Sequence, residues 1–240
     1  MLRLSFAISC LIVLGLSTPV FAGIVQVLSA DFNSDVVGDA PDASLPGDPS
    51  GDRISFWRSS GYSEVSAGSG VMADQPLKIN KPDGGGITRF HIAPDYRSCE
   101  SYVLRWTTMI EGPQAATNFT LRDISYNTIA VLGFQGSSLW TGLGTDQMFP
   151  DVGIPSAYGV AFAFELRLDR ANNVYDLFVN DSPVPGMQGY PAYGGDLDRI
   201  EVAFGGLTPH FIYVDDLSIS ADCSSVAAEP TSWGQLKSRF

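Results

Sequence analysis

Hydrophobic and polar residues alternate along most of the chain, in short segments separated by glycine, proline, asparagine and aspartate. The clearest segment covers residues 158–168, where every second residue is aromatic or aliphatic and the residues between are small or polar. Residues 102–110 repeat this pattern. A period of two residues is typical of a β-strand with one buried face. The alternation therefore predicts two long strands that each turn an apolar face toward a core.

Further segments share this apolar or alternating character and are bounded by turn residues; they are residues 24–29, 54–58, 77–80, 87–92, 119–124, 129–134, 174–179, 200–204 and 211–219. Helical periodicity is almost absent. Many strands without intervening helices imply two packed antiparallel sheets. The predicted fold class is all-β, a two-sheet antiparallel sandwich of the jelly-roll kind.

The start of the chain has the pattern of a cleavable signal peptide. Arg3 supplies a positive charge, an apolar run covers residues 6–16, and Val20-Phe21-Ala22 offers the small residues that a signal peptidase needs. We expect residues 1–22 to be removed and the protein to be secreted, to the outside or the surface of a bacterial cell. The remaining chain divides into a domain, residues 23–223, and a tail, residues 224–240.

Two cysteines remain after the predicted cleavage, Cys99 and Cys223. In an oxidising compartment such a pair predicts one disulfide, and the alternative is two separate buried thiols. The bond would close a loop of more than a hundred residues, which the chain-entropy model values at roughly 5 kcal/mol.

The charge of the chain narrows the choice of partners. There are 26 acidic and 14 basic residues, which give a formal net charge of −12. A field of this sign repels nucleic acid and anionic membranes and is compatible with neutral glycans or divalent cations. No stretch after the signal peptide approaches the roughly 20 apolar residues of a transmembrane helix.

Three segments carry a family resemblance. Residues 31–41 read DFNSDVVGDAP, residues 164–169 and 173–180 read FELRLD and NVYDLFVN, and residues 211–219 read FIYVDDLSI. They resemble the opening, the paired strands and the closing strand of the laminin-G and concanavalin-like jelly-roll domains of bacterial extracellular proteins. The resemblance implies the sandwich fold, but this architecture hosts binding modules, hydrolases and lyases alike.

The closing segment raises the question of a metal. If Phe211, Tyr213 and Leu217 face the core, Asp215 shares their face, and a buried carboxylate needs a compensating cation or donor. The resemblance implies a structural Ca²⁺ here, with Asp215 and Asp216 as ligands. The alternative is a β-bulge that turns Asp215 toward water. Asp31, in an acidic stretch near the N-terminus, is a further candidate ligand.

Few residues suggest catalysis. The two histidines, His91 and His210, have no histidine or cysteine neighbour at a zinc-ligand spacing, and no nucleophile elbow or phosphate loop is present. Glu165 and Asp169, with Arg167 between them, are the nearest pair of acids for a glycosidase. An ion-paired outer face explains these three residues more simply.

Glycan binding requires exposed aromatic rings. The candidates are Trp140, the pair Tyr190 and Tyr193 in a turn-rich segment, Trp57 and Tyr62.

These patterns favour a secreted, non-catalytic recognition module for a carbohydrate. Two alternatives stay open: a polysaccharide-active hydrolase or lyase, and a structural or adhesive surface component. The tail, residues 224–240, is basic and amphipathic near its end and could dock a partner or simply fray.

Overall fold

The computed structural model describes residues 24–33, 35–38, 54–57, 62–68, 72, 74–80, 86–111, 116–135, 138–142, 151–155, 159–205 and 211–223. The predicted signal peptide, residues 1–22, and the predicted tail, residues 224–240, lie outside the described residues. No helix among the described residues is long and apolar enough to cross a membrane.

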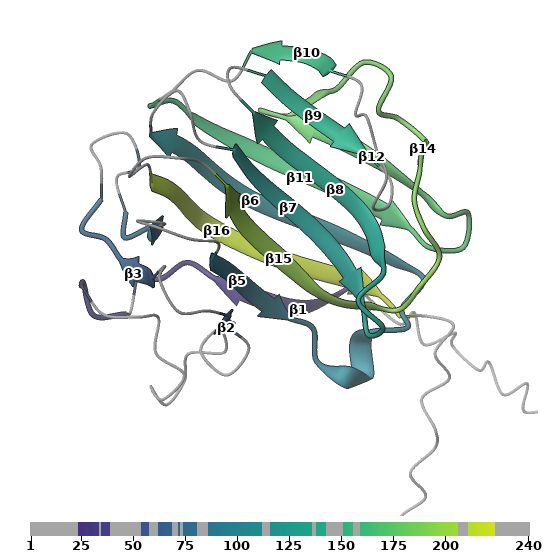
Figure 1. Ribbon diagram of the computed structural model, residues 1–240. Coiled ribbons are helices and arrows are strands. Elements are labelled where there is room, and N and C mark those ends of the chain that lie inside the picture. The colour runs from purple at the N-terminus through teal and green to yellow at the C-terminus, as the bar shows by residue number, and fades with distance from the viewer. Residues whose placement is uncertain are drawn as a thin grey trace, which may run out of the picture.

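The described chain forms two antiparallel sheets that pack face to face (Figure 1). The nine-stranded sheet contains β1 (Val25–Ala30), β3 (Tyr62–Val65), β4 (Leu77–Asn80), β6 (Ser101–Glu111), β11 (Ala161–Asp169), β12 (Val174–Val179), β13 (Ser182–Pro183), β14 (Tyr190–Pro191) and β16 (Phe211–Asp222). Its order is β13-β12-β11-β6-β16-β4-β3, with β1 paired to β16 and β14 paired to β12.

The seven-stranded sheet contains β2 (Ile54–Trp57), β5 (Gly86–His91), β7 (Ala116–Asp123), β8 (Thr128–Gln135), β9 (Ser138–Gly142), β10 (Asp151–Pro155) and β15 (Leu197–Gly205). Its order is β10-β9-β8-β7-β15-β5-β2. A short 3₁₀ helix, η2 (Pro94–Tyr96), follows β5. The predicted fold class, a two-sheet antiparallel sandwich, is therefore confirmed.

The long strands lie where the alternation predicts them, and several of the short ones were missed. Strands β4 and β12 match their predicted bounds, whereas β3, β9, β10, β13 and β14 were not predicted. Strand β11 begins at Ala161, later than the alternation suggests. Gly159 lies just before the strand and has a positive φ of 69°, which interrupts the extended backbone there. The next residue, Val160, is exposed.

The apolar faces of the two sheets form one core between the layers. At its centre the ring of Trp106 on β6 stacks on Phe164 of β11 and on Phe119 of β7, with ring centroids 5.3 and 5.2 Å apart. Because β6 and β7 belong to different sheets, these contacts join the two layers. The core side predicted for β6 is thereby confirmed.

A β-bulge in β16 corrects the predicted faces of that strand. The register places Tyr213 opposite Met109 and Asp215 opposite Thr107, then shifts before Ser218, which lies opposite Arg105. Before the bulge, Ile212 and Val214 therefore face the core, and the prediction that Phe211 and Tyr213 do so is wrong. The extra residue restores Leu217 to the core side, and Asp216 takes a positive φ of 51° at this point.

Cys99 and Cys223 form the predicted disulfide. It joins the residue just after the end of β16 to the turn that precedes β6, and these two strands pair along most of their length. The bond therefore fixes one end of the central strand pair of the nine-stranded sheet.

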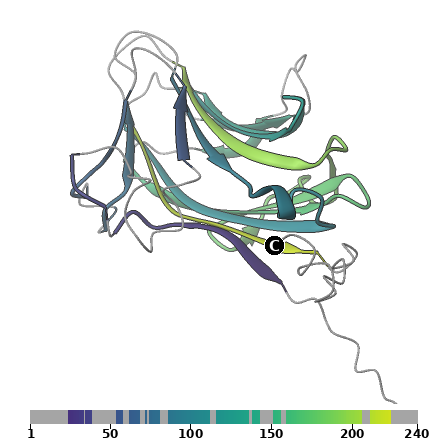
Figure 2. The same cartoon turned by 90° about the horizontal axis from the view of Figure 1, so that it is seen from below.

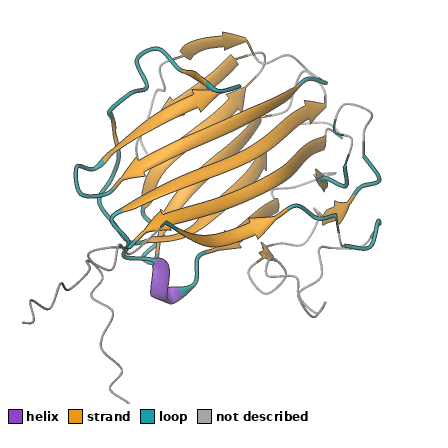
Figure 3. Cartoon of the chain, turned by 180° about the vertical axis from the view of Figure 1, so that it is seen from behind, coloured by secondary structure: helices purple, strands orange, loops and turns teal. Residues whose placement is uncertain are grey.

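The two sheets bend in the same sense. In the view of Figure 2 the outer face of the seven-stranded sheet lies on the concave side of that bend. Figure 3 shows the nine-stranded sheet from its outer, convex side. The two outer faces are where side chains of the strands can meet a ligand.

Candidate functional site

The strands of the seven-stranded sheet carry charged residues on their outer face. On β15, Ile200 and Val202 belong to the core, so Arg199 and Glu201, which alternate with them, lie on the opposite side. On β5 the same alternation puts Phe90 in the core and Arg89 and His91 outside. Charged residues thus follow two neighbouring strands in the middle of the sheet.

The strand register aligns these residues into two rows. In one row Arg199 lies opposite His91 on β5 and opposite Arg122 on β7. In the next row Glu201 lies opposite Arg89 on β5 and opposite Thr120 on β7. Neighbours directly opposite across antiparallel strands are within side-chain contact. Residues up to 112 positions apart in sequence therefore meet on one face.

Three arginines converge on one glutamate, and we call Arg89, Arg122, Arg199 and Glu201 the arginine cluster. The Nε of Arg89 donates to Glu201 Oε1 at 2.8 Å, and the Nε of Arg122 donates to Glu201 Oε2 at 2.9 Å. The Nε of Arg199 lies 3.7 Å from Glu201 Oε1. Arg199 and Glu201 are nearly fully buried, with 7 and 5% of their side chains exposed.

Three further residues border the arginine cluster: Asp198 and Tyr126 contact Arg199, and Arg97 contacts Asp198. Asp198 forms ion pairs with Arg199, at 3.2 Å, and with Arg97, at 2.7 Å. Tyr126, in the β7–β8 turn, places its ring centroid 3.9 Å from the Arg199 Cζ atom. This is a cation–π distance, and the Tyr126 ring remains more than half exposed. The cluster therefore lies beneath an aromatic ring at the surface.

His91 joins the cluster as a neutral group. Burial lowers its pKa, and the positive charge of Arg199 lowers it further, against the opposite effect of Asp198. At neutral pH the positive charge of this face therefore comes from the arginines.

Two of the predicted aromatic residues lie in the row beside the cluster. The strand register connects one row across the sheet: Trp57, Ile87, Ala203, Asn118, Gly133 and Trp140. Ile87 and Ala203 are two residues from Arg89 and Glu201 along their strands, a step that returns to the same face. In the backbone register, Trp57 and Trp140 thus lie at the two ends of this row.

The other predicted aromatic residues lie elsewhere. Tyr62 is on β3, at the edge of the nine-stranded sheet, opposite Asn80. Tyr190 is on β14 and packs its ring edge-on against core residue Tyr175, with centroids 5.5 Å apart. Tyr193 is exposed, as expected of the turn-rich segment. The structure therefore places Trp57 and Trp140 at opposite ends of one backbone row and does not gather the five predicted residues into one site.

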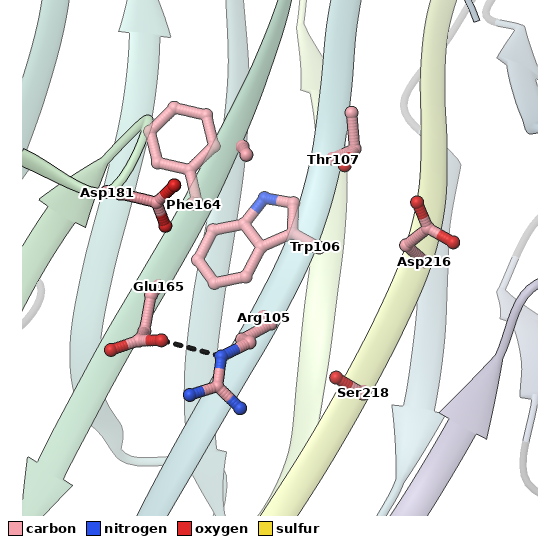
Figure 4. Close-up of a pocket in the computed structure, with 9 residues that line it drawn as sticks. Arg105, Trp106, Thr107, Phe164, Glu165, Asp181, Asp216 and Ser218 are labelled. Atoms are coloured by element: carbon pink, nitrogen blue, oxygen red, sulfur yellow. Dashed lines mark hydrogen bonds and ion pairs between the residues drawn. The ribbon is translucent and has the colours of Figure 1, made fainter.

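The convex outer face carries a shallow pocket of about 290 Å³ between β11, β6 and β16 (Figure 4). It is lined by Arg105, Trp106, Thr107, Ala163, Phe164, Glu165, Asp181, Asp216 and Ser218. Glu165 accepts hydrogen bonds from Arg105 Nε at 2.6 Å and Arg167 Nε at 2.5 Å. Although burial raises the pKa of Glu165, these two hydrogen bonds outweigh it and lower the pKa. Glu165 is therefore held as an ion-paired carboxylate.

The predicted metal ligands lie near the β16 bulge. Asp215 is on the outer face, as the bulge alternative requires, yet it is buried. Burial raises its pKa to about 6, and the negative charges of Asp216, Asp74 and Asp31 add to that rise. Within the described residues, no three carboxylate, imidazole or thiol groups are placed so that they could hold a metal ion. The Ca²⁺ site therefore stays a prediction.

The arginine cluster was missed by sequence reasoning, although the sequence contains a signal for it. Arg89 and His91, and likewise Arg199 and Glu201, are pairs of ionisable residues at a spacing of two residues within largely apolar strands. Such spacing puts both side chains on one face. What the sequence does not contain is the strand order that makes β5, β15 and β7 neighbours.

The fold and these faces define the class of the protein: a two-sheet antiparallel β-sandwich of the jelly-roll kind. No family model matches the chain, and no curated protein matches it.

Several solved structures share the fold at low sequence identity. The chain is similar to a sialidase with a TM-score of 0.60 and 12% identity, over 81% of this chain and 18% of the sialidase. It is similar to a carbohydrate esterase from a Shiga toxin-encoding bacteriophage with a TM-score of 0.57 and 11% identity, over 83% of this chain and all (100%) of the esterase. An alginate lyase has a TM-score of 0.52 and 14% identity, over 80 and 95% of the two chains. At such identities the similarity establishes the fold and leaves the function open.

Proposed function

We propose that this protein is a secreted carbohydrate-binding module of the concanavalin-like type, and that the outer face of its seven-stranded sheet contacts the glycan. The observation that carries the proposal is a pair of adjacent rows in the backbone register of that sheet. One row contains Arg89 and Glu201, and the next has Trp57 and Trp140 at its ends. Charged hydrogen-bonding groups beside aromatic residues are the usual means of holding a sugar ring.

The structural neighbours support the carbohydrate part of the proposal. Their names describe proteins that act on sugars, namely a sialidase, a carbohydrate esterase and an alginate lyase. An extended, concave face also suits a chain of sugar units better than a single small ligand. The disulfide between Cys99 and Cys223 supports secretion, since such bonds persist mainly in oxidising compartments.

A glycan array tests the proposal, with the full-length protein applied in Ca²⁺ and again in a chelator. We expect binding to at least one class of polysaccharide, and a Trp140→Ala variant that binds about tenfold more weakly because a stacking ring is lost. Tyr193→Ala, which removes an aromatic ring outside the two rows, is the matched control and should bind like the wild type. Absence of glycan binding in both conditions would contradict the proposal.

The second candidate function is an enzyme that cleaves the polysaccharide on the same face. It is favoured by His91, whose lowered pKa leaves a neutral imidazole beside Arg199 and Arg89 at neutral pH. Chromatography of a bound polysaccharide after long incubation separates the two functions. Shortened products that disappear in a His91→Gln variant would support the enzyme, and an unchanged chain length would support the binding module.

A further inference from the structure

The arginine cluster and its border hold more positive than negative charge. Four arginines, Arg89, Arg97, Arg122 and Arg199, form ion pairs with two carboxylates, Asp198 and Glu201. The network therefore has two positive charges in excess, although the whole chain has a formal net charge of −12. The composition of the whole chain would predict a negative charge at this network, not a positive one. This ion-pair network is locally positive on an acidic protein.

Arg199 is the member of the cluster whose hydrogen-bonding capacity is least used. Both oxygens of Glu201 already accept short hydrogen bonds from Arg89 and Arg122. Within the described part of the chain, the Nε and Nη2 atoms of Arg199 are buried and have no hydrogen-bond partner. Buried donors on a charged group are costly to leave unsatisfied. The Arg199 guanidinium can therefore donate hydrogen bonds to an acceptor that the described chain does not supply.

The surroundings of Arg199 define what that acceptor can be. The Tyr126 ring covers the guanidinium at 3.9 Å, so a partner must approach the remaining N–H groups from the side. An oxygen atom of an anion suits a guanidinium better than a neutral hydroxyl does, because two parallel N–H···O bonds can form and the charges attract. The excess of positive charge favours the same choice.

From this geometry we infer that the arginine cluster is a subsite for the anionic substituent of an acidic polysaccharide, a carboxylate or a sulfate ester, with Arg199 as its principal ligand. The inference rests on the proposed function, since it names the substrate class of the same face. It also goes beyond the net charge of the chain, which is compatible with a neutral glycan.

Isothermal titration calorimetry of the protein with soluble polymers, at low and at high salt, tests this inference. Alginate presents carboxylates, dextran sulfate presents sulfate esters, and dextran and hydroxyethylcellulose are neutral. We expect one of the two acidic polymers to bind at least about tenfold more tightly than the neutral ones, with affinity falling as salt rises. The polymer that binds identifies carboxylate or sulfate as the substituent.

Two variants locate the effect. Arg199→Gln should weaken binding of the acidic polymer by about tenfold or more, because a buried charged partner is lost. Arg105→Gln removes the same charge from the outer face of the other sheet and should leave binding unchanged. If circular dichroism shows that Arg199→Gln does not fold, Arg122→Gln takes its place, since its side chain is more exposed.

The outcomes separate the two proposals. Neutral polymers that bind as tightly as acidic ones, or equal losses from Arg199→Gln and Arg105→Gln, would overturn the anionic subsite and leave the proposed function standing. Failure of every glycan on the array and every polymer here to bind would overturn the proposed function, and the subsite with it.

Discussion

The two outer faces of the sandwich contain the same ionic arrangement in different surroundings. On the nine-stranded sheet Glu165 binds the Nε atoms of Arg105 and Arg167, and on the seven-stranded sheet Glu201 binds the Nε atoms of Arg89 and Arg122. The arginines around Glu165 are 54 and 53% exposed, whereas those around Glu201 are 25% exposed or less.

The difference in burial changes what each arrangement contributes. Exposed ion pairs gain little, because water and salt screen them, so the Glu165 group is an ordinary charged surface. The Glu201 group has been taken out of water at a considerable desolvation cost, and it includes a third arginine that the glutamate does not satisfy. Equal chemistry thus gives an exposed charged group on one face and a largely buried ion-pair network on the other.

The largest expected effect is the loss of stability in Glu201→Gln. The substitution keeps the shape of the side chain but leaves three buried or half-buried arginines without their carboxylate. We expect the free energy of unfolding to fall by about 3 kcal/mol, as measured by urea denaturation. A loss below about 1 kcal/mol would show that solvent screens this group as well, and the contrast between the faces would disappear.

Asp215, on the outer face of the nine-stranded sheet, sharpens the comparison because it is a buried carboxylate with no arginine ion pair among the described residues. Its pKa is raised from 3.8 to about 6, first by burial and then by Asp216, Asp74 and Asp31. Between about pH 4 and pH 6 the folded protein holds a proton that the unfolded chain has lost, so stability falls as the pH rises through this window. Asp215→Asn should therefore be more stable than the wild type at pH 7, by on the order of 2 kcal/mol, and show no gain at pH 3.5.

Thermal unfolding in a chelator at the two pH values measures this gain, and a parallel scan in Ca²⁺ tests the predicted metal. If Ca²⁺ raises the melting temperature of the wild type but not of Asp215→Asn, the carboxylates bind the ion. If Asp215→Asn is no more stable than the wild type at pH 7 in the chelator, the charged Asp215 carboxylate does not destabilise the folded protein.

The smallest expected effect belongs to Glu165→Gln. Both of its arginine partners are more than half exposed and can turn to water, so the free energy of unfolding should change by about 1 kcal/mol or less. High salt should reduce even this difference, because exposed charges are screened. A loss as large as that of Glu201→Gln would contradict the distinction between the two faces.

The fold could be predicted from the sequence because its signals are local. A period of two residues identifies the long strands and their buried side, and a single cysteine pair after the predicted cleavage site identifies the disulfide. The bulge in β16 could be named only as an alternative, because an added residue changes the parity of a strand without altering its composition. The faces of Phe211 and Tyr213 were therefore reversed.

The candidate site was predicted only in part. Trp57 and Trp140 were chosen as aromatic residues, but nothing local shows that they share a row. The arginine cluster depends on pairing between β5, β15 and β7, which are far apart in sequence. His91 was judged by its immediate neighbours and set aside, and its partner across the strands, Arg199, is distant in the chain.

The disulfide has a mechanical consequence for whatever follows Cys223. Tension applied to the residues after this cysteine enters the domain at a covalent bond to Cys99, next to the start of β6. The load is therefore shared by two neighbouring strands in the middle of the sheet, and β16 cannot be peeled away from this end one hydrogen bond at a time. Reduction of the bond would turn a fixed attachment point into a strand end that opens under a pull.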